Sequence, residues 1–341
     1  MGTISVADSK KAFSQTMKKC SFVCSILVIF IHAYNLEVYK IGSDSIAYWI
    51  ERFFSNFTAC AVPFFFMSSA FFLYQKERKT GSVYKSRFKS IVLPYLWWNT
   101  LYMIGFSVLK KLSLSNVGLD GINIIDILKG IFLYKYNYVY WFMFSLILFT
   151  FLYPVIKQVI GRNRFICFSV LAILLVIDFF KIVNHNIVNS FVYYYIGAVA
   201  GHYYTEQLEK IATMHPNKKV ACIVFCIFGF ALSLVANMFH INITIIGNLA
   251  VILLLLIVLS VPRFKIPPFL LGLSFMIYSL HSILLECVEK IIYIVFPHNA
   301  LWAMIDYFTA PAITFVMIVG LCAAMKKICP HLYEMLNGYR K

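Results

Sequence analysis

Long apolar segments recur along the whole chain, and each is about as long as a membrane-spanning helix. Hydrophobic residues make up 61% of the sequence and charged residues only 13%, with a mean hydropathy of +0.81. A soluble domain is closer to half apolar and a quarter charged. The segments are continuously apolar rather than short and alternating, which is typical of helices and not of a membrane β-barrel. The sequence therefore predicts an all-α, polytopic membrane protein.

The spacing of these segments predicts ten membrane-spanning helices. If the amino terminus is cytoplasmic, the cytoplasmic side holds 22 of the 30 Lys and Arg residues, which predicts both termini in the cytoplasm. We expect one integral membrane domain over 1–341, with cytoplasmic tails at 1–19 and 326–341 and a transmembrane bundle over 20–325. The expected spans are 20–36, 55–74, 90–109, 138–156, 165–181, 189–204, 220–239, 243–261, 269–294 and 302–325.

The net charge of +16 could suggest nucleic-acid binding, but the distribution of the basic residues excludes it. They lie in short loops between apolar segments, which is the pattern of membrane orientation. The nine cysteines lie mostly within apolar segments and show no spacing typical of metal ligands, so we expect reduced core cysteines and no metal site.

One histidine, His32, lies near the end of the first apolar segment. At a helical rise of about 1.5 Å per residue, it is roughly 20 Å beyond Lys19 and past the midplane of the membrane. An ionisable group there costs free energy unless it has a partner, so it indicates a functional site. The alternative is a neutral histidine that is hydrogen-bonded to a neighbouring helix or lies at the interface.

A second histidine, His281, is expected at a similar depth in the ninth span. Two imidazoles at one level could act as base and partner in proton transfer. Hydrogen bonding to nearby serines or tyrosines, such as Ser279 or Tyr278, is the alternative. Lys18 falls on the same helix face as His32, so a polar track could lead from the cytoplasmic edge to the histidine. Simple snorkelling of Lys18 to the interface explains its position equally well.

Basic residues also gather before the third span, at Lys85, Arg87 and Lys89. Such a cluster suits a phosphorylated ligand, although membrane topology is the ordinary explanation. Acidic residues fall mostly near the outer ends of the spans, where they could orient a histidine, bind a sugar hydroxyl or simply be solvated. They are Glu51, Asp178, Glu286, Glu289 and Asp306.

Six segments in order resemble the membrane acyltransferase 3 family, and together they extend across nearly the whole chain. Each segment alone is apolar and degenerate, but their order is fairly specific. The segments are ILVIFIHAYN, AVPFFFMSSAFFLYQK, KSRFKSIVLPYLWWN, YVYWFMFSLILFTFLYPVI, YYYIGAVAG and LGLSFMIYSLHSILLE.

The resemblance implies a ten-helix enzyme of the bacterial plasma membrane that moves an acyl group, commonly acetyl. The donor would be cytoplasmic acyl-coenzyme A, and the acceptor a hydroxyl of a saccharide or glycolipid, as in cell-surface polysaccharide O-acetylation. It implies no metal or prosthetic group. His32 matches the family histidine, and Arg87 fits the basic position before Pro94. Ser21 stands where the family has an arginine, which is a departure.

The mechanism that follows places the donor phosphates against Lys85, Arg87 or Lys89, with Lys18 as a further cation near the position of the family arginine. His32 would act as the general base on the acceptor hydroxyl or support acyl transfer directly, and His281 would orient the acceptor or share the proton. Two other functions stay open: a transporter or flippase of a lipid-linked saccharide, and a catalytically silent relative. Turnover of a thioester separates the first function from both.

Overall fold

The computed structural model describes residues 6–113, 116–119, 121, 123–183 and 185–338. The chain is 80% helical, and no strand occurs among these residues, so the predicted all-α class is confirmed. The chain divides into two compact units that interleave in sequence. Unit 1 consists of Met1–Lys76 and Arg164–Leu321, and unit 2 of Glu77–Asn163 and Cys322–Lys341.

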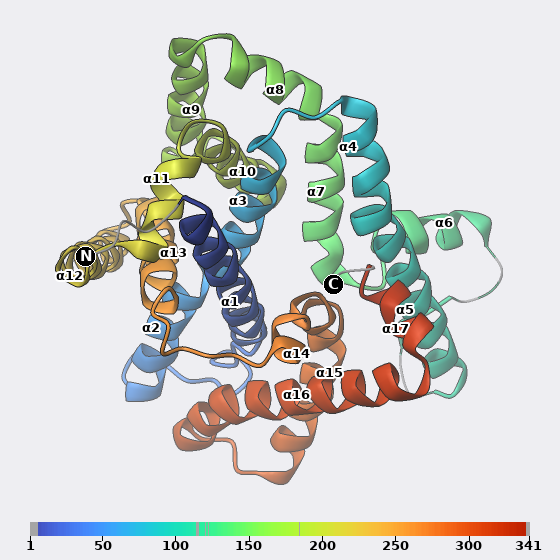
Figure 1. Ribbon diagram of the computed structural model, residues 1–341. Coiled ribbons are helices and arrows are strands. Elements are labelled where there is room, and N and C mark those ends of the chain that lie inside the picture. The colour runs from blue at the N-terminus through green and yellow to red at the C-terminus, as the bar shows by residue number, and fades with distance from the viewer. Residues whose placement is uncertain (1–5, 114–115, 120, 122, 184, 339–341) are drawn as a thin grey trace. The chain divides into compact units, whose positions relative to one another are not determined.

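Unit 1 is organised around its first helix, which packs against α3, α13 and α15 (Figure 1). The helices of unit 1 are α1 (Val6–His32), α2 (Ile46–Thr58), α3 (Ala61–Tyr74), α9 (Arg164–Phe179), α10 (Asn186–Tyr203), α11 (Thr205–Glu209), η3 (Lys210–Thr213), α12 (Pro216–Met238), α13 (Thr244–Leu259), α14 (Pro268–Leu271), α15 (Ser274–Val295) and most of α16 (Ala300–Ile328).

Unit 2 contains shorter helices and one stretch of π-helix. Its elements are α4 (Thr80–Arg87), the π-helix η1 (Phe88–Val92), α5 (Leu93–Lys111), α6 (Ile124–Phe132), η2 (Tyr138–Tyr140), α7 (Trp141–Phe151), α8 (Tyr153–Arg162), the end of α16 and α17 (Pro330–Leu336). The axes of α7 and α8 differ by 59° at the start of α8. Pro94 in α5 and Pro154 in α8 both lie in the first turn, where the missing amide proton of proline is tolerated.

Five helical segments in the described part of the chain are long and apolar enough to cross a membrane, or six if the bent α7–α8 pair is one span. This confirms a membrane protein with several spanning helices. α9 and α13 have only 16 residues each, or about 24 Å of helix, which is shorter than a hydrocarbon core of about 30 Å. The number of ten spans and the cytoplasmic termini stay predictions, as does the single membrane domain over 1–341.

The first helix begins much earlier than the predicted span, because α1 starts at Val6 rather than at residue 20. Most of the predicted tail 1–19 is therefore helical, and its apolar side chains explain why. Phe13 and Met17 are buried, and the Phe13 ring packs edge-on against Phe71 at a centroid distance of 5.7 Å. Residues 1–5 and 339–341 of the predicted tails lie outside the described residues.

Two glycines allow α10 to lie directly against α3. A Cβ atom on Gly197 would overlap the backbone carbonyl of Met67, and a Cβ atom on Gly201 would overlap that of Phe71. The two glycines are four residues apart and so share one face of α10, in the small-residue spacing that brings membrane helices together. Two of the six family-like segments, AVPFFFMSSAFFLYQK and YYYIGAVAG, therefore pack on each other within unit 1.

Candidate active site

His32 is the last residue of α1 and is half-buried. The helix closes with the amide of Ala33 donating to the carbonyls of Ile29 and Phe30, at 3.1 and 3.3 Å. The expected span ran on to residue 36, so the structure places His32 at the end of its helix rather than inside it. A side chain at that end can face groups from other helices.

His281 is fully buried on α15. Its Nδ1 atom lies 2.7 Å from the backbone oxygen of Tyr278 and 3.2 Å from that of Ile277. Carbonyl oxygens only accept hydrogen bonds, so Nδ1 carries the proton and the neutral ring keeps a lone pair on Nε2. That Nε2 atom has no hydrogen-bond partner in the part of the chain that the structure describes. A buried lone pair held in this way can receive a proton.

The two histidine rings lie side by side, with a centroid distance of 5.0 Å and an angle of 37° between their planes. The sequence placed them at a similar depth, and the structure brings them into contact. Two imidazolium charges at this distance would repel each other, so the pair accommodates one added proton more easily than two. The arrangement places two side chains that can transfer protons next to each other.

The polar track expected along α1 is only partly present. Lys18 is exposed, and the Ser21 hydroxyl donates to the Met17 carbonyl of its own helix at 2.9 Å. The neighbouring Lys19 donates to the carbonyl of Leu259, the last residue of α13, at 3.1 Å. A cation at a helix carboxyl terminus is electrostatically favourable, so Lys19 has a structural role there.

Polar residues from three elements meet just beyond the end of α1. The backbone amide of Asn35 donates to Glu51 Oε1 at 2.8 Å. The Asn35 side chain donates through Nδ2 to the Ala303 carbonyl at 3.1 Å and to Asp306 Oδ2 at 3.2 Å. Asn35 thus links the loop after α1 to α2 and α16. Sequence reasoning had noted Glu51 and Asp306 but missed Asn35, although it closes the family-like segment ILVIFIHAYN.

Tyr39 completes this polar group from the same loop. Its hydroxyl donates to Asp306 Oδ2 at 3.2 Å. Burial, followed by the charge of Asp306, raises the pKa of Tyr39, so the hydroxyl stays protonated and remains a donor. Asp178, also expected near an outer end, lies elsewhere in unit 1 and bonds instead to Lys181 and Asn242.

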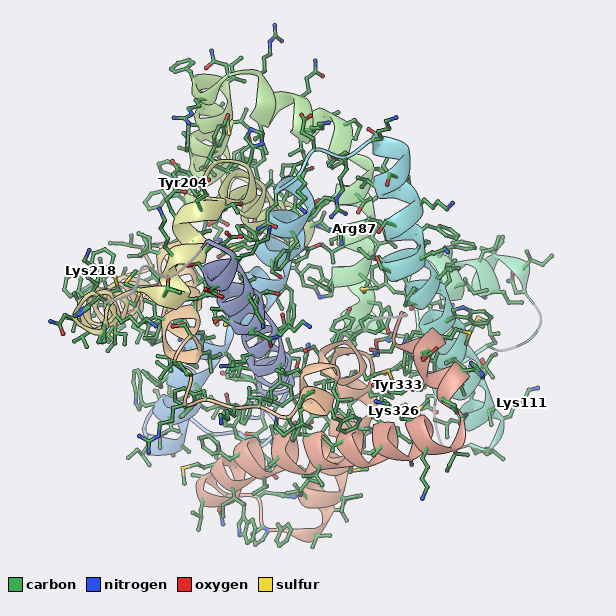
Figure 2. All side chains as sticks on the ribbon, viewed as in Figure 1. Arg87, Lys111, Tyr204, Lys218, Lys326 and Tyr333 are labelled. Carbon is green, nitrogen blue, oxygen red and sulfur yellow. The ribbon has the colours of Figure 1, made fainter. Side chains whose placement is uncertain are left out.

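The basic residues expected to bind the donor lie in unit 2. Lys85 and Lys89 are exposed and four residues apart, and Arg87, labelled in Figure 2, is half-buried at the end of α4. The π-helix η1 joins α4 to α5 and ends two residues before Pro94, whose nitrogen carries no proton for the α-helical pattern. The Leu93 amide instead donates to the carbonyl of Phe88, five residues earlier. Such π-helical turns occur often at functional sites.

The structure therefore groups the predicted site residues by unit. His32 and His281 lie together in unit 1, which also contains Lys18, whereas Lys85, Arg87 and Lys89 belong to unit 2. The catalytic and donor-binding roles of these six residues stay predictions.

A helical membrane protein with two histidine rings in contact fits the class of membrane acyltransferases suggested by the sequence. The model of a family described as an acyltransferase domain matches residues 22–326, so the chain belongs to the acyltransferase 3 family. No curated protein and no solved structure matches the chain significantly.

Proposed function

We propose that this acyltransferase moves an acyl group, most commonly acetyl, from acyl-coenzyme A to a hydroxyl of a saccharide or glycolipid. The setting is O-acetylation of cell-surface polysaccharide at the bacterial plasma membrane, with ten spans and both termini in the cytoplasm. The contact between His32 and His281, in a chain of this family, carries the proposal. Removal of a proton from a hydroxyl needs a side chain that can accept it, and His32 beside the fixed Nε2 lone pair of His281 supplies such a group.

In the proposed reaction, His32 takes the proton of the acceptor hydroxyl as its oxygen attacks the thioester carbonyl carbon. A carbon–oxygen bond forms, the carbon–sulfur bond breaks, and the proton leaves with the thiolate as free coenzyme A. His281 shares the positive charge or orients the acceptor, because its Nε2 lone pair faces no other hydrogen-bond donor within the described residues. Base catalysis of this kind contributes about 10²–10⁴ to the rate.

The donor binds through its phosphates to the basic residues of unit 2. Lys85 and Lys89 are exposed on adjoining turns, and Arg87 offers a planar guanidinium that pairs with two phosphate oxygens at once. Lys18, exposed on α1, is proposed as a further cation for the donor.

The test is release of coenzyme A from acetyl-coenzyme A by the purified protein in the presence of a glycolipid extract. His32→Ala should lower the rate by about 10²-fold or more, since the base is removed. His202→Ala is the matched control, because His202 is an exposed histidine of α10 in the same unit. Thermal unfolding monitored for all three proteins separates loss of the base from loss of fold.

Equal rates in wild type and a folded His32→Ala variant would refute the role of His32. A folded wild-type protein that releases no coenzyme A with any of several donors would favour transport or a catalytically silent relative.

A further inference from the structure

Unit 1 buries a group of polar side chains whose hydrogen bonding is incomplete. We name Asn35, Glu51, Asp306 and Tyr307 the carboxyl cluster; their exposed fractions are 4%, 2%, 2% and 1%. Each has one atom without a hydrogen-bond partner among the residues that the structure describes. These atoms are Asn35 Oδ1, Glu51 Oε2, Asp306 Oδ1 and the Tyr307 hydroxyl oxygen.

The other oxygen of each carboxyl group is held by hydrogen bonds. Glu51 Oε1 accepts the Asn35 amide, and Asp306 Oδ2 accepts from both Asn35 Nδ2 and the Tyr39 hydroxyl. A carboxyl group is planar, so anchoring one oxygen also limits where the second can lie. Asn35 links the two carboxyl groups, because its backbone amide donates to Glu51 and its side chain donates to Asp306. Tyr307 follows Asp306 directly on α16.

This group lacks what usually compensates buried carboxyl groups. Neither Glu51 nor Asp306 forms a salt bridge within the described ranges. Nor do the described residues contain any group of three or more His, Cys, Asp or Glu side chains that could hold a metal ion. Buried polar atoms are nearly always hydrogen-bonded, and a buried acceptor without a partner costs free energy. Three unpartnered acceptors therefore favour a ligand that presents several hydrogen-bond donors.

The carboxyl cluster lies next to the histidine pair. Asn35 follows His32 by three residues, so their Cα atoms are at most about 11 Å apart. The ring of Phe30, two residues before His32, contacts the Tyr307 ring at a centroid distance of 5.8 Å. A small molecule bound to the carboxyl cluster would thus be long enough to reach His32.

An aromatic group connects the cluster to an exposed part of unit 1. The ring of Tyr39, whose hydroxyl bonds to Asp306, lies 5.6 Å from that of Tyr293. Tyr293 in turn stacks on the exposed His298 at a centroid distance of 3.9 Å. Apolar ring faces with a few fixed polar groups are the usual lining of a small-molecule site.

We propose that the carboxyl cluster binds neighbouring hydroxyl groups of a saccharide acceptor and so positions the reacting hydroxyl at His32. This inference rests on the proposed acyl transfer and names its acceptor subsite. The sugar donates its O–H groups to Glu51 Oε2, Asp306 Oδ1 and Asn35 Oδ1, and the Tyr307 hydroxyl donates to a sugar oxygen. These residues touch the acceptor but take no part in bond making.

The test compares wild type with Asp306→Asn in a detergent that carries no sugar. The probes are glucose, as a free saccharide, and monoglucosyl diacylglycerol, as a glycolipid, with diacylglycerol as the sugar-free control. At least one sugar probe should raise the midpoint of thermal unfolding of the wild type without any donor present. The same probe should bind Asp306→Asn at least about tenfold more weakly, since an amide nitrogen, which only donates, replaces the acceptor oxygen Oδ1. The probe that acts shows whether a free sugar or a lipid headgroup is bound.

Asp178→Asn is the matched control, because Asp178 is also a buried aspartate of unit 1 but has partners for both oxygens. In the coenzyme A release assay, Asp306→Asn should raise the acceptor KM about tenfold and leave the acetyl-coenzyme A KM unchanged. Two results would overturn the subsite: no stabilisation of the wild type by either sugar probe, or equal probe affinity in Asp306→Asn and Asp178→Asn, as expected if only buried water fills the cluster. Sugar binding that depends on Asp306, without coenzyme A release, would refute the transfer reaction and support the subsite.

Discussion

The contact between α3 and α10 yields a prediction about stability that the structure makes quantitative. In Gly197→Ala, the new Cβ atom meets the Met67 backbone, which cannot move aside as a flexible side chain could. Overpacking of this kind costs about 1–3 kcal/mol. Alanine regains about 1 kcal/mol of helix propensity relative to glycine. The obstacle is backbone, which favours the upper part of the range, so we expect a net loss of about 1–2 kcal/mol.

Gly320→Ala is the control for this substitution. Gly320 is also a helical glycine of unit 1, but a Cβ atom there would meet nothing within 4 Å. Only the propensity gain applies, so this variant should be more stable than wild type by up to about 1 kcal/mol. The assay is unfolding in mixed micelles by increasing sodium dodecyl sulfate, followed by tryptophan fluorescence. Equal midpoints for the two variants would refute the close approach of the two backbones.

Two further predictions concern His281 and the surface of unit 2. His281→Asn should keep a donor near the position of Nδ1 for the Tyr278 carbonyl, so the stability of the protein should change little. The variant loses the lone pair at Nε2, so the rate of acyl transfer should fall about 10²-fold. Full activity would show that His281 is purely structural. Asp126→Asn should remove a salt-sensitive, pH-dependent part of stability, because a hydrogen bond from Lys135 lowers the pKa of Asp126. This contribution is present above the ordinary carboxyl pKa of about 4 and is lost as the pH falls through the lowered value. Identical acid unfolding curves for wild type and variant would contradict it.

The histidine pair was accessible from the sequence because depth along a helix follows directly from residue count. His32 and His281 each lie a fixed number of residues from a basic or proline-marked boundary, and helices running in one direction bring such positions to one level. The same reasoning predicted that Glu51 and Asp306 both lie near the outer ends of the spans. Their meeting through Asn35 was not predictable, because it depends on the conformation of a loop.

Other features of the fold were not predicted, because the sequence signal for them was misleading or absent. The early start of α1 was hidden by its lysines, which suggested a tail, although Phe13 and Met17 provide a buried face. The π-helix before α5 had a signal in Pro94, but proline alone does not tell a kink from a wider turn. The predicted number of spans also differs from the number of helices long enough to cross a membrane. Helices such as α9 are apolar but shorter than a hydrocarbon core.

The interleaving of the two units has a consequence for the time course of synthesis. The buried Trp98 indole donates to the carbonyl of Leu336 at 3.0 Å, and both residues belong to unit 2. All of the second segment of unit 1, Arg164–Leu321, is translated between them. At about 5–20 residues per second, the Trp98 donor waits roughly 10–50 s for its acceptor. The Trp98–Leu336 hydrogen bond can thus form only after this segment of unit 1 has been made, and a truncation before α17 would leave the Trp98 indole without this acceptor.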